Sequence, residues 1–191
     1  MWHGLLLDAS FRSLLLNADF ELAEEVRRGC CPFCGGALHA AHYPRKPRGG
    51  PELPPEHDVR LSFCCAIDGC RKRCTPPSLR FLGRRVYWAT VFVIVTVLRH
   101  GPTPERMRKL QELVGASRRT IERWCAWWRA SFVESHLWRA SAFIPPIAPS
   151  DLPGSLLERF RGDGRRRLVA LLRFLESLTG GANQIRLAEG R

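Results

Sequence analysis

Apolar residues recur at helical spacing along much of the chain, and this pattern predicts a mainly helical protein. Residues 5–28 carry two apolar clusters; the second has acidic residues in its first turns and Arg27 and Arg28 at its end. That charge order matches the helix dipole, so we expect helix here, with Asp19 capping the second cluster. The apolar face is compatible with docking or dimerisation, but we expect it to pack in the core.

A second apolar stretch runs without a break from Val86 to Leu98 and is flanked by Arg84-Arg85 and Gly101-Pro102. Its 13 residues exceed the length of an ordinary strand but are too few to span a bilayer. We therefore expect a central buried helix, with a buried strand as the alternative.

Two further helices are predicted on either side of a short turn. Thr103 is the expected N-cap and Pro104 the first helical residue, and an apolar stripe runs from there to Val114. Gly115 ends this helix and Ser117 caps the next. The second helix has one apolar stripe, formed by Ile121, Trp124, Cys125, Trp128 and Phe132.

The tryptophans of this region can pack or stack on bases. Trp124 and Trp128 lie on the apolar stripe, so we expect both in the core. Trp127 and Trp138 lie off the stripe. We expect them to pack on the following segment, with stacking on a nucleotide as the alternative.

The C-terminal part breaks the helical pattern before resuming it. Residues 143–149 are proline-rich and predict a linker. Short amphipathic helices are expected at 152–160 and 168–178, on either side of the arginine-rich tract 161–167, which is either a phosphate contact or a polar turn. From Gly180 onward the composition predicts a frayed tail.

The cysteines are concentrated in the first half of the chain, where two pairs have metal-ligand spacing. Cys31 and Cys34 are separated by two residues and followed by two glycines, and Cys65 and Cys70 form a second pair. Zinc prefers four soft ligands in a tetrahedron, and two such knuckles on adjacent hairpins supply them. The sequence therefore predicts a Zn²⁺ site made by Cys31, Cys34, Cys65 and Cys70.

Three other cysteines lie within reach of this site and could replace a ligand. Cys65 is preferred to Cys64 because residues 63–65 are typical of a strand, in which Cys64 and Cys65 point to opposite faces. Cys74 is expected to pack as an apolar strand residue, and Cys30 precedes the first pair. The alternative is that all of these cysteines are small buried hydrophobic residues without a metal.

The segment between the two pairs predicts a projecting loop. Residues 43–56 hold five prolines and two glycines among fourteen residues, which argues against helix and regular strand. Arg45, Lys46 and Arg48 in this loop are either phosphate contacts or part of a solvated tip.

These cysteine motifs resemble those of a known family. The order Cys-Pro-x-Cys-Gly-Gly at 31–36, a second cysteine pair, and Arg-Lys-Arg-Cys-Thr-Pro-Pro-Ser at 71–78 is similar to the zinc ribbons at the start of bacterial insertion-sequence transposases. In that family a helix-turn-helix follows the ribbon. The resemblance covers about residues 30–135 and implies DNA binding at the ends of mobile elements.

The charge of the chain fits a polyanionic partner. The net charge is +12, from 30 basic and 18 acidic residues, and all but three of the basic residues are arginines. The positive excess begins at the second cysteine pair and continues through the predicted helix-turn-helix. Nucleic acid is the commonest polyanion, and general solubility is the alternative explanation.

The second helix of the predicted helix-turn-helix carries the candidate DNA contacts. In this arrangement the N-terminal residues of the second helix reach base edges in the major groove. We expect base or phosphate contacts from Arg118, Arg119 and Arg123, with Ser117 and Thr120 as shorter donors. The alternative is that these arginines only solvate an exposed face.

No catalytic centre is expected in this chain. A transposase needs clustered carboxylates that hold two divalent metals. The acids after residue 140 have helical or loop contexts, and no alternating strand pattern joins them; they are Asp151, Glu158, Asp163, Glu176 and Glu189. Cys125 lies on a core stripe, where nothing marks a base for it.

Together these patterns predict a mainly α protein with a small β zinc ribbon, followed by a three-helix unit that contains the helix-turn-helix. The expected domains are a helical segment (1–29), the ribbon (30–83), the DNA-binding unit (84–140) and a linker with C-terminal helices (141–191). We expect a cytoplasmic, non-enzymatic protein that binds double-stranded DNA and does not bind membranes. Its expected role is that of a transposase-like or mobile-element accessory protein. The expected protein partners are a second copy of the chain or a mobile-element protein. The alternatives are an RNA or single-strand binder and a zinc-scaffolded protein-interaction module. The lack of a basic segment before the first leucines argues against a signal peptide.

Overall fold

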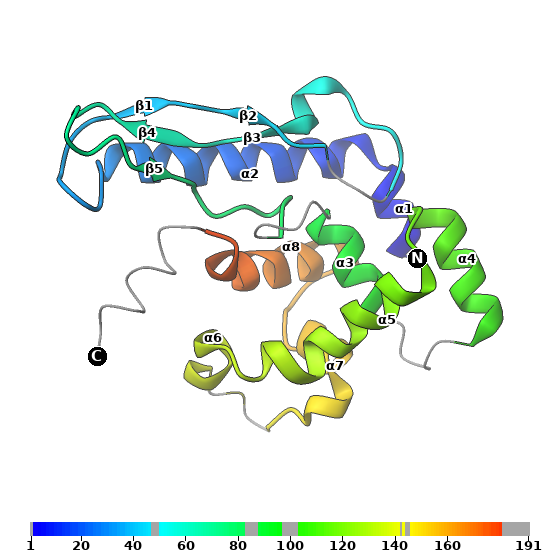
Figure 1. Ribbon diagram of the computed structural model, residues 1–191. Coiled ribbons are helices and arrows are strands. Elements are labelled where there is room, and N and C mark those ends of the chain that lie inside the picture. The colour runs from blue at the N-terminus through cyan, green and yellow to red at the C-terminus, as the bar shows by residue number, and fades with distance from the viewer. Residues whose placement is uncertain are drawn as a thin grey trace.

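A narrow β ribbon lies along the long helix α2, and a body of shorter helices packs on the other side of that helix (Figure 1). The computed structural model describes residues 2–46, 50–82, 88–96, 103–141, 143 and 146–180. This part of the chain is mainly helical with a small antiparallel sheet, as the sequence predicted. Within it, no helix combines the length and the apolar character needed to cross a bilayer.

The elements follow one another in a simple order. The helices are α1 (Trp2–Leu7), α2 (Ala9–Arg28), α3 (Ala89–Thr96), α4 (Pro104–Val114), α5 (Arg118–Trp127), α6 (His136–Ala140), α7 (Gly154–Glu158) and α8 (Gly164–Leu175). The strands are β1 (Leu38–Ala40), β2 (Tyr43–Pro44), β3 (Val59–Arg60), β4 (Phe63–Cys65) and β5 (Arg73–Cys74). A π-helical turn continues α5 over Trp128–Phe132, and short 3₁₀ turns lie at Pro55–Asp58, Pro149–Asp151 and Glu176–Leu178.

Helix α2 has its cap further upstream than the charge pattern predicted. Asp8 is the N-cap, and its carboxylate accepts a hydrogen bond of 2.9 Å from the Ser10 N–H. Asp19 instead lies inside the helix with 1% of its surface exposed. It shares the buried face with Leu15 and Leu22, since residues three and four apart fall on one side of a helix. The prediction of Asp19 as a cap is therefore wrong, whereas the predicted core packing of this helix is confirmed.

The ribbon is an antiparallel sheet with the strand order β1-β4-β5. Leu38 on β1 lies opposite Cys65 on β4, and Phe63 on β4 lies opposite Cys74 on β5. These four side chains are buried and form a small hydrophobic cluster with Ala23 of α2. The ribbon therefore uses the C-terminal half of α2 to cover its inner face.

A second, two-stranded sheet corrects one expectation for the proline-rich segment. Tyr43 and Pro44 form β2, which pairs with β3 in antiparallel register. The prediction that residues 43–56 contain no strand is therefore wrong at this point. A proline is tolerated here because both strands of a two-stranded sheet are edges, where a missing N–H costs little. Residues 47–49, including Arg48, lie outside the described residues.

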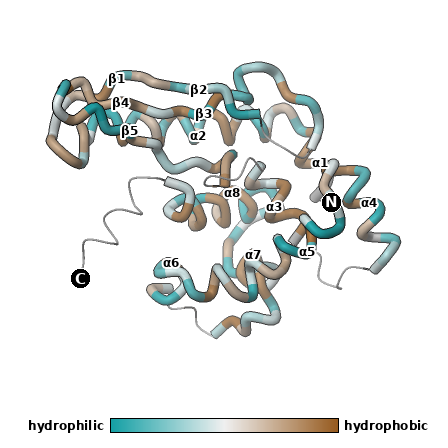
Figure 2. The backbone as a smooth tube through the Cα atoms, viewed as in Figure 1, coloured by the Kyte–Doolittle hydropathy of each residue, from teal (hydrophilic) through white to brown (hydrophobic). Residues whose placement is uncertain are grey.

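The helical body has a larger core of its own. Every described side chain of α3 is buried, and the brown, apolar stretches of α3 and α8 lie in the middle of the body (Figure 2). Helix α5 packs against α3 and α4, and its Ile121 and Trp124 side chains enter the same cluster. The predicted buried helix at 86–98 is thus confirmed for Ala89–Thr96. Its flanks, 83–87 and 97–102, lie outside the described residues.

The C-terminal helices differ in their bounds from the prediction. Asp163 is the N-cap of α8 and accepts a hydrogen bond of 2.8 Å from the Arg166 N–H, so α8 begins at Gly164 rather than Leu168. The arginines at 165–167 therefore lie in the first turn of a helix, so the alternative of a polar turn does not apply to these three. The buried leucines of α8 belong to the same core as α3 and α5. The predicted frayed tail begins at Gly180, and all of it beyond that residue lies outside the described residues.

Candidate metal centre and nucleic-acid interface

Four cysteine thiols meet at one end of the ribbon. The Sγ atoms of Cys31, Cys34, Cys65 and Cys70 all lie within 4.8 Å of one another. The Cys31 and Cys70 sulfurs are 3.7 Å apart, and the Cys34 and Cys65 sulfurs are 3.4 Å apart. A Zn–S bond of about 2.3 Å would place tetrahedral sulfurs about 3.8 Å from one another. The cluster therefore has the composition and size of a four-thiolate metal site.

The first knuckle depends on its two glycines. The Gly35 N–H donates to the Cys31 carbonyl and the Cys31 N–H donates to the Gly36 carbonyl, both at 2.8 Å. Gly35 has a φ of 72°, a left-handed conformation that glycine adopts without strain. A Cβ on Gly36 would lie 2.5 Å from the Ile67 side chain and 3.1 Å from the Cys65 sulfur. Gly36 thus lets the two knuckles approach closely enough for their sulfurs to meet.

The second knuckle is a turn between β4 and β5. The Cys65 N–H donates to the Lys72 carbonyl at 3.0 Å, and the Cys70 N–H donates to the Ile67 carbonyl at 2.9 Å. Arg71 follows with a φ of 43°, which reverses the chain into β5. Cys65, at the end of one strand, and Cys70, in the turn, therefore point to the same side.

The charge state of the thiols follows from their surroundings. Burial raises the pKa of the Cys31 thiol, but hydrogen bonds from the Phe33 and Cys34 backbone and from neighbouring thiols outweigh it and lower this pKa to about 7. Burial, the largest single cause, raises the pKa of the Cys65 thiol. Four neighbouring thiols cannot all lose their protons by themselves, because the thiolates would repel one another. A bound divalent cation removes this obstacle and deprotonates the thiols that coordinate it.

The remaining cysteines of this region stay outside the cluster. Cys64 lies on the opposite face of β4, and its thiol donates to the Arg71 carbonyl at 3.3 Å. Cys74 is buried in the ribbon core, and burial raises the pKa of its thiol to about 11. Cys30 is exposed. The structure thus brings together the four cysteines selected from the sequence and leaves these three apart.

Helix α5 begins at the residue that the sequence predicted. Ser117 is its N-cap, and the Ser117 Oγ accepts a hydrogen bond of 3.3 Å from the Thr120 N–H. The connection from α4 is residues 115–117, so α4 and α5 form two helices joined by a short turn. The predicted order of helix, turn and capped helix is present here.

Aromatic side chains hold α5 against α3. The Phe92 ring of α3 lies 5.6 Å from the Trp128 ring and 5.1 Å from the Trp127 ring, measured between centroids. The Trp138 ring lies 5.3 Å from that of Phe132. Trp124 and Trp128 are fully buried, as predicted. The prediction that Trp127 and Trp138 pack rather than stand free is also confirmed.

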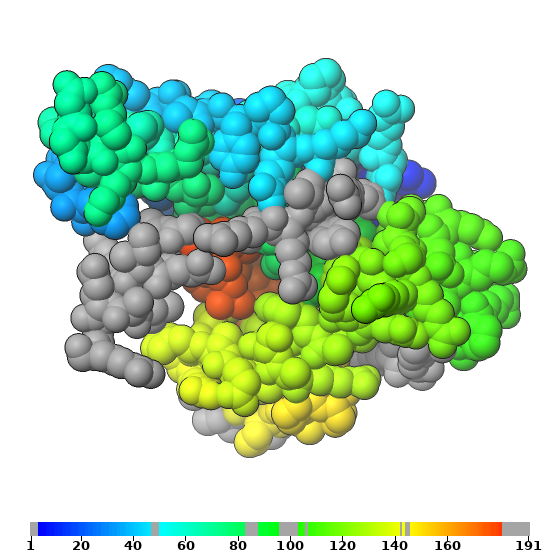
Figure 3. All heavy atoms as spheres, in the orientation of Figure 1, coloured from blue at the N-terminus to red at the C-terminus, as the bar shows by residue number. Residues whose placement is uncertain are grey.

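The predicted DNA contacts lie on the opposite, exposed side of α5. Arg118, Arg119 and Arg123 are all exposed. The Arg118 Nε donates to Glu122 at 2.8 Å, and Arg123 donates to the Thr120 hydroxyl at 3.4 Å. In the described part of the chain, Arg119 has no hydrogen bond or ion pair. In the space-filling view α4 and α5 form one end of the molecule, away from the cysteine end of the ribbon (Figure 3).

A buried ion pair between ribbon and helices was missed from the sequence. The Arg80 Nε lies 2.8 Å from an Asp19 carboxylate oxygen, and both side chains are at most 2% exposed. The same carboxylate accepts hydrogen bonds from the Ser78 hydroxyl at 2.5 Å and from the Leu79 N–H at 2.7 Å. An acid in the middle of an apolar helical face was the available signal. The residues around Asp19 do not indicate its partner Arg80, which is 61 residues away in the sequence.

The Arg80 guanidinium also binds the second sheet. It donates to the His57 and Val59 carbonyls, each at 3.1 Å, and the nearby Arg60 donates to the Pro76 carbonyl at 2.5 Å. The Ser78 N–H donates to the Thr179 hydroxyl at 2.8 Å. We call Asp19, Ser78 and Arg80 the polar junction, because it joins α2, the segment after β5, the second sheet and the C-terminal turn.

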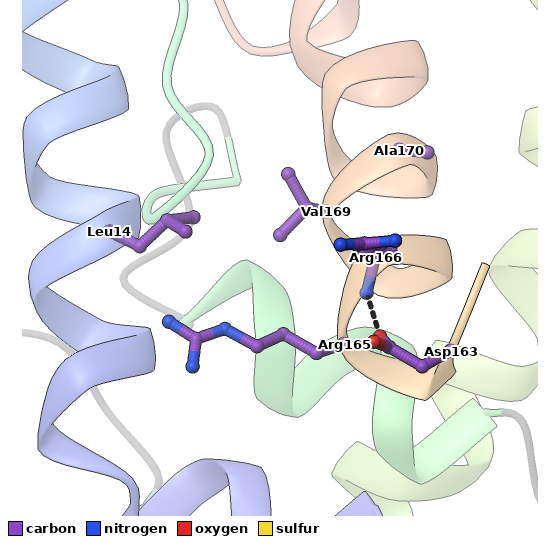
Figure 4. Close-up of a pocket in the computed structure, with 6 residues that line it drawn as sticks. All are labelled: Leu14, Asp163, Arg165, Arg166, Val169 and Ala170. Carbon is purple, nitrogen blue, oxygen red and sulfur yellow. Dashed lines mark hydrogen bonds between the residues drawn. The ribbon is translucent and has the colours of Figure 1, made fainter.

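A shallow hollow between α2 and α8 lies near charged residues. It has a volume of about 490 Å³ and is lined by Leu14, Asp163, Arg165, Arg166, Val169 and Ala170 (Figure 4). Arg165 is already bound to the Ser10 hydroxyl at 3.0 Å and lies 3.5 Å from the Asp8 carboxylate. Asp163 occupies the helix N-terminus. We therefore assign no ligand to this hollow.

No protein-family model matches the sequence, and no match was found among curated proteins or among solved structures. The resemblance to transposase zinc ribbons stays a prediction. Function must be inferred from the residues themselves.

Proposed function

We propose that Cys31, Cys34, Cys65 and Cys70 hold one Zn²⁺ ion, and that the chain binds double-stranded DNA through the exposed face of α5. The zinc would be structural, because four protein thiolates leave no open coordination position. It would fix the tip of the ribbon, whose strands are only two or three residues long. The ion would have no part in binding DNA directly.

The observation that carries the DNA proposal is the division of α5 into two faces. Ile121 and Trp124 anchor one face in the core, and the other face presents Arg119 and Arg123 to solvent, where neither has a carboxylate partner among the described residues. An arginine without a carboxylate partner is available for a phosphate or for the O6 and N7 atoms of guanine. A helix held rigidly on one side and basic on the other suits insertion into a major groove.

Duplex DNA is favoured over single strands by the state of the aromatic side chains. Base stacking requires open aromatic faces. Lys72 lies over the Phe33 ring at 4.3 Å, and Arg73 lies over the Tyr43 ring at 5.4 Å. Trp127 is enclosed by other rings. Each of these three side chains already has a partner beside its ring.

The DNA recognised in the cell is part of the same proposal. The ribbon followed by two helices resembles the N-terminal region of insertion-sequence transposases, so the ends of a mobile element are the candidate target. The chain would act there as an accessory protein or beside a separate transposase.

The zinc proposal is tested by metal analysis of the purified chain. We expect about one zinc per chain, retained on gel filtration and removed by a chelator. Zinc content near zero in protein purified without chelator and under reducing conditions would overturn the proposal.

The DNA proposal is tested by binding to duplex and single-stranded oligonucleotides at several salt concentrations. Five or six neutralised phosphates predict a log–log slope of about −5 against salt. The double variant Arg119→Ala, Arg123→Ala should lose most of the affinity. The double variant Arg27→Ala, Arg28→Ala is the matched control, because it removes two exposed arginines, 54% and 70% exposed, at the end of α2. A preference for single strands, or no binding to nucleic acid, would contradict the proposal.

A further inference from the structure

The exposed face of α5 contains an acid as well as arginines. Residues at i, i+3, i+4 and i+7 share one side of a helix, and here they are Arg119, Glu122, Arg123 and Ala126. All four are exposed, whereas Ile121 and Trp124 on the opposite side are buried. A DNA groove that accommodates Arg119 and Arg123 must therefore also accommodate Glu122, which lies beside them on the helix.

Glu122 is held in a defined position on this face. One of its carboxylate oxygens accepts a hydrogen bond of 2.8 Å from the Arg118 Nε. The Glu122 side chain is nevertheless 48% exposed, so the carboxylate keeps capacity to accept a further hydrogen bond. Arg118 thus acts as a support that orients the carboxylate on the helix surface.

An acid at this position is unfavourable for affinity alone. A carboxylate beside a phosphate backbone repels it and weakens binding to every sequence. The Arg118–Glu122 pair also has the basic residue N-terminal to the acid, which is the weaker orientation for stabilising a helix. Neither general affinity nor helix stability therefore accounts well for Glu122.

We propose that Glu122 is a specificity residue that accepts a hydrogen bond from the N4 amino group of a cytosine in the major groove. Carboxylates accept from cytosine N4, the exocyclic donor that C·G pairs present there. This inference rests on the proposed binding of α5 to duplex DNA. It adds that the helix selects against bases that present an acceptor at the Glu122 position.

The experiment is selection from a pool of randomised duplexes by the full chain, followed by binding measurements on the selected site. The wild type should enrich cytosine at one position and bind the selected site about tenfold more tightly than a duplex changed there. Glu122→Gln should lose this preference, with adenine favoured at that position because glutamine pairs with adenine N6 and N7. Its affinity for unrelated duplex should stay equal or rise.

Glu112→Gln is the matched control. Arg108 and Glu112 form the same kind of pair on α4, with the nitrogen and oxygen 3.3 Å apart and both side chains more than 60% exposed. This variant makes the same change of charge outside the α5 face and should keep the cytosine preference. Circular dichroism should show both variants folded.

The possible failures are distinguishable. If the wild type binds no duplex, the proposed function itself fails. If the wild type binds duplex but Glu122→Gln keeps the same base preference, or if no position is selected at all, the inference about Glu122 fails while DNA binding stands.

Discussion

The cysteine cluster and the exposed face of α5 are built in opposite ways. Each thiol of the cluster is placed by backbone turns, and the Cys31 and Cys65 side chains are at most 2% exposed. The side chains of the α5 face extend into solvent, and the helix period, the buried tryptophans behind it and local hydrogen bonds such as Arg118–Glu122 set their positions. A change in the cluster should therefore alter the fold, whereas a change on the α5 face should alter only binding.

This difference agrees with what each region is proposed to bind. A structural metal site needs its ligands fixed before the ion can be retained, so turn geometry is part of the site. A DNA-reading face needs side chains that can adjust to base edges and phosphates, with rigidity supplied from behind. The predictions below test this contrast.

The largest effect is expected from the neighbouring cysteines of β4. Cys65→Ser removes a buried ligand, so zinc content should fall from about one to near zero per chain and the ribbon should lose its order. Cys64→Ser changes the adjacent residue on the other face and should keep both zinc and fold. Metal analysis and the dispersion of amide NMR signals measure the two outcomes. Equal behaviour of the two variants would remove the basis for the chosen ligand set.

A second large effect is expected at the polar junction. Asp19→Asn leaves the Arg80 guanidinium buried without its counter-charge, which should lower the free energy of unfolding by about 3–5 kcal/mol. Urea denaturation followed by tryptophan fluorescence measures this. Glu24→Gln is the control, because Glu24 is an exposed acid on the same helix, paired with Arg27 at 2.8 Å. This variant should change the free energy of unfolding little. A small effect of Asp19→Asn would show that the junction does not couple the ribbon to the helices.

An intermediate effect is expected where the two knuckles touch. Gly36→Ala places a methyl group against Ile67 and the Cys65 sulfur, which should cost about 1–3 kcal/mol of stability. Gly69→Ala adds a methyl group that meets nothing within 4 Å and should be nearly neutral. Thermal melting of the zinc-loaded protein compares them. Similar melting temperatures would mean that the knuckles can move apart without loss.

The smallest effect on the fold is expected on the α5 face. Arg119→Ala should change the free energy of unfolding by no more than about 0.5 kcal/mol, because the side chain has no partner in the described structure. It should reduce the salt slope of duplex binding by about 1 if Arg119 contacts a phosphate. If the residue reads a base, it should instead relax selectivity at one position. Unchanged affinity, slope and selectivity would exclude Arg119 from the interface.

The parts of the structure that the sequence predicted correctly are set by local patterns. Strand alternation separates Cys65 from Cys64, and paired spacing selects Cys31 and Cys34. Helix period and a serine cap place α5, including the burial of Trp124. These signals lie within a few residues of what they determine.

The errors have two causes, a partner distant in sequence and a local cap that the pattern did not reveal. Asp19 was predicted as a cap from its neighbours, but its role is set by Arg80. The start of α8 was placed four residues late, because the arginines hide the cap at Asp163. Tyr43 and Pro44 form a strand only because Val59 and Arg60 return beside them.

The polar junction also determines where the chain could be divided. A fragment of residues 30–83 would contain Arg60 and Arg80 but would lack Asp19 and the helical surface that covers the inner strands. A fragment from residue 84 onward would lose the apolar side of α2 that helps to fill the core. The ribbon is therefore not expected to keep its fold without α2. A graft of the ribbon into another protein would have to include this helix.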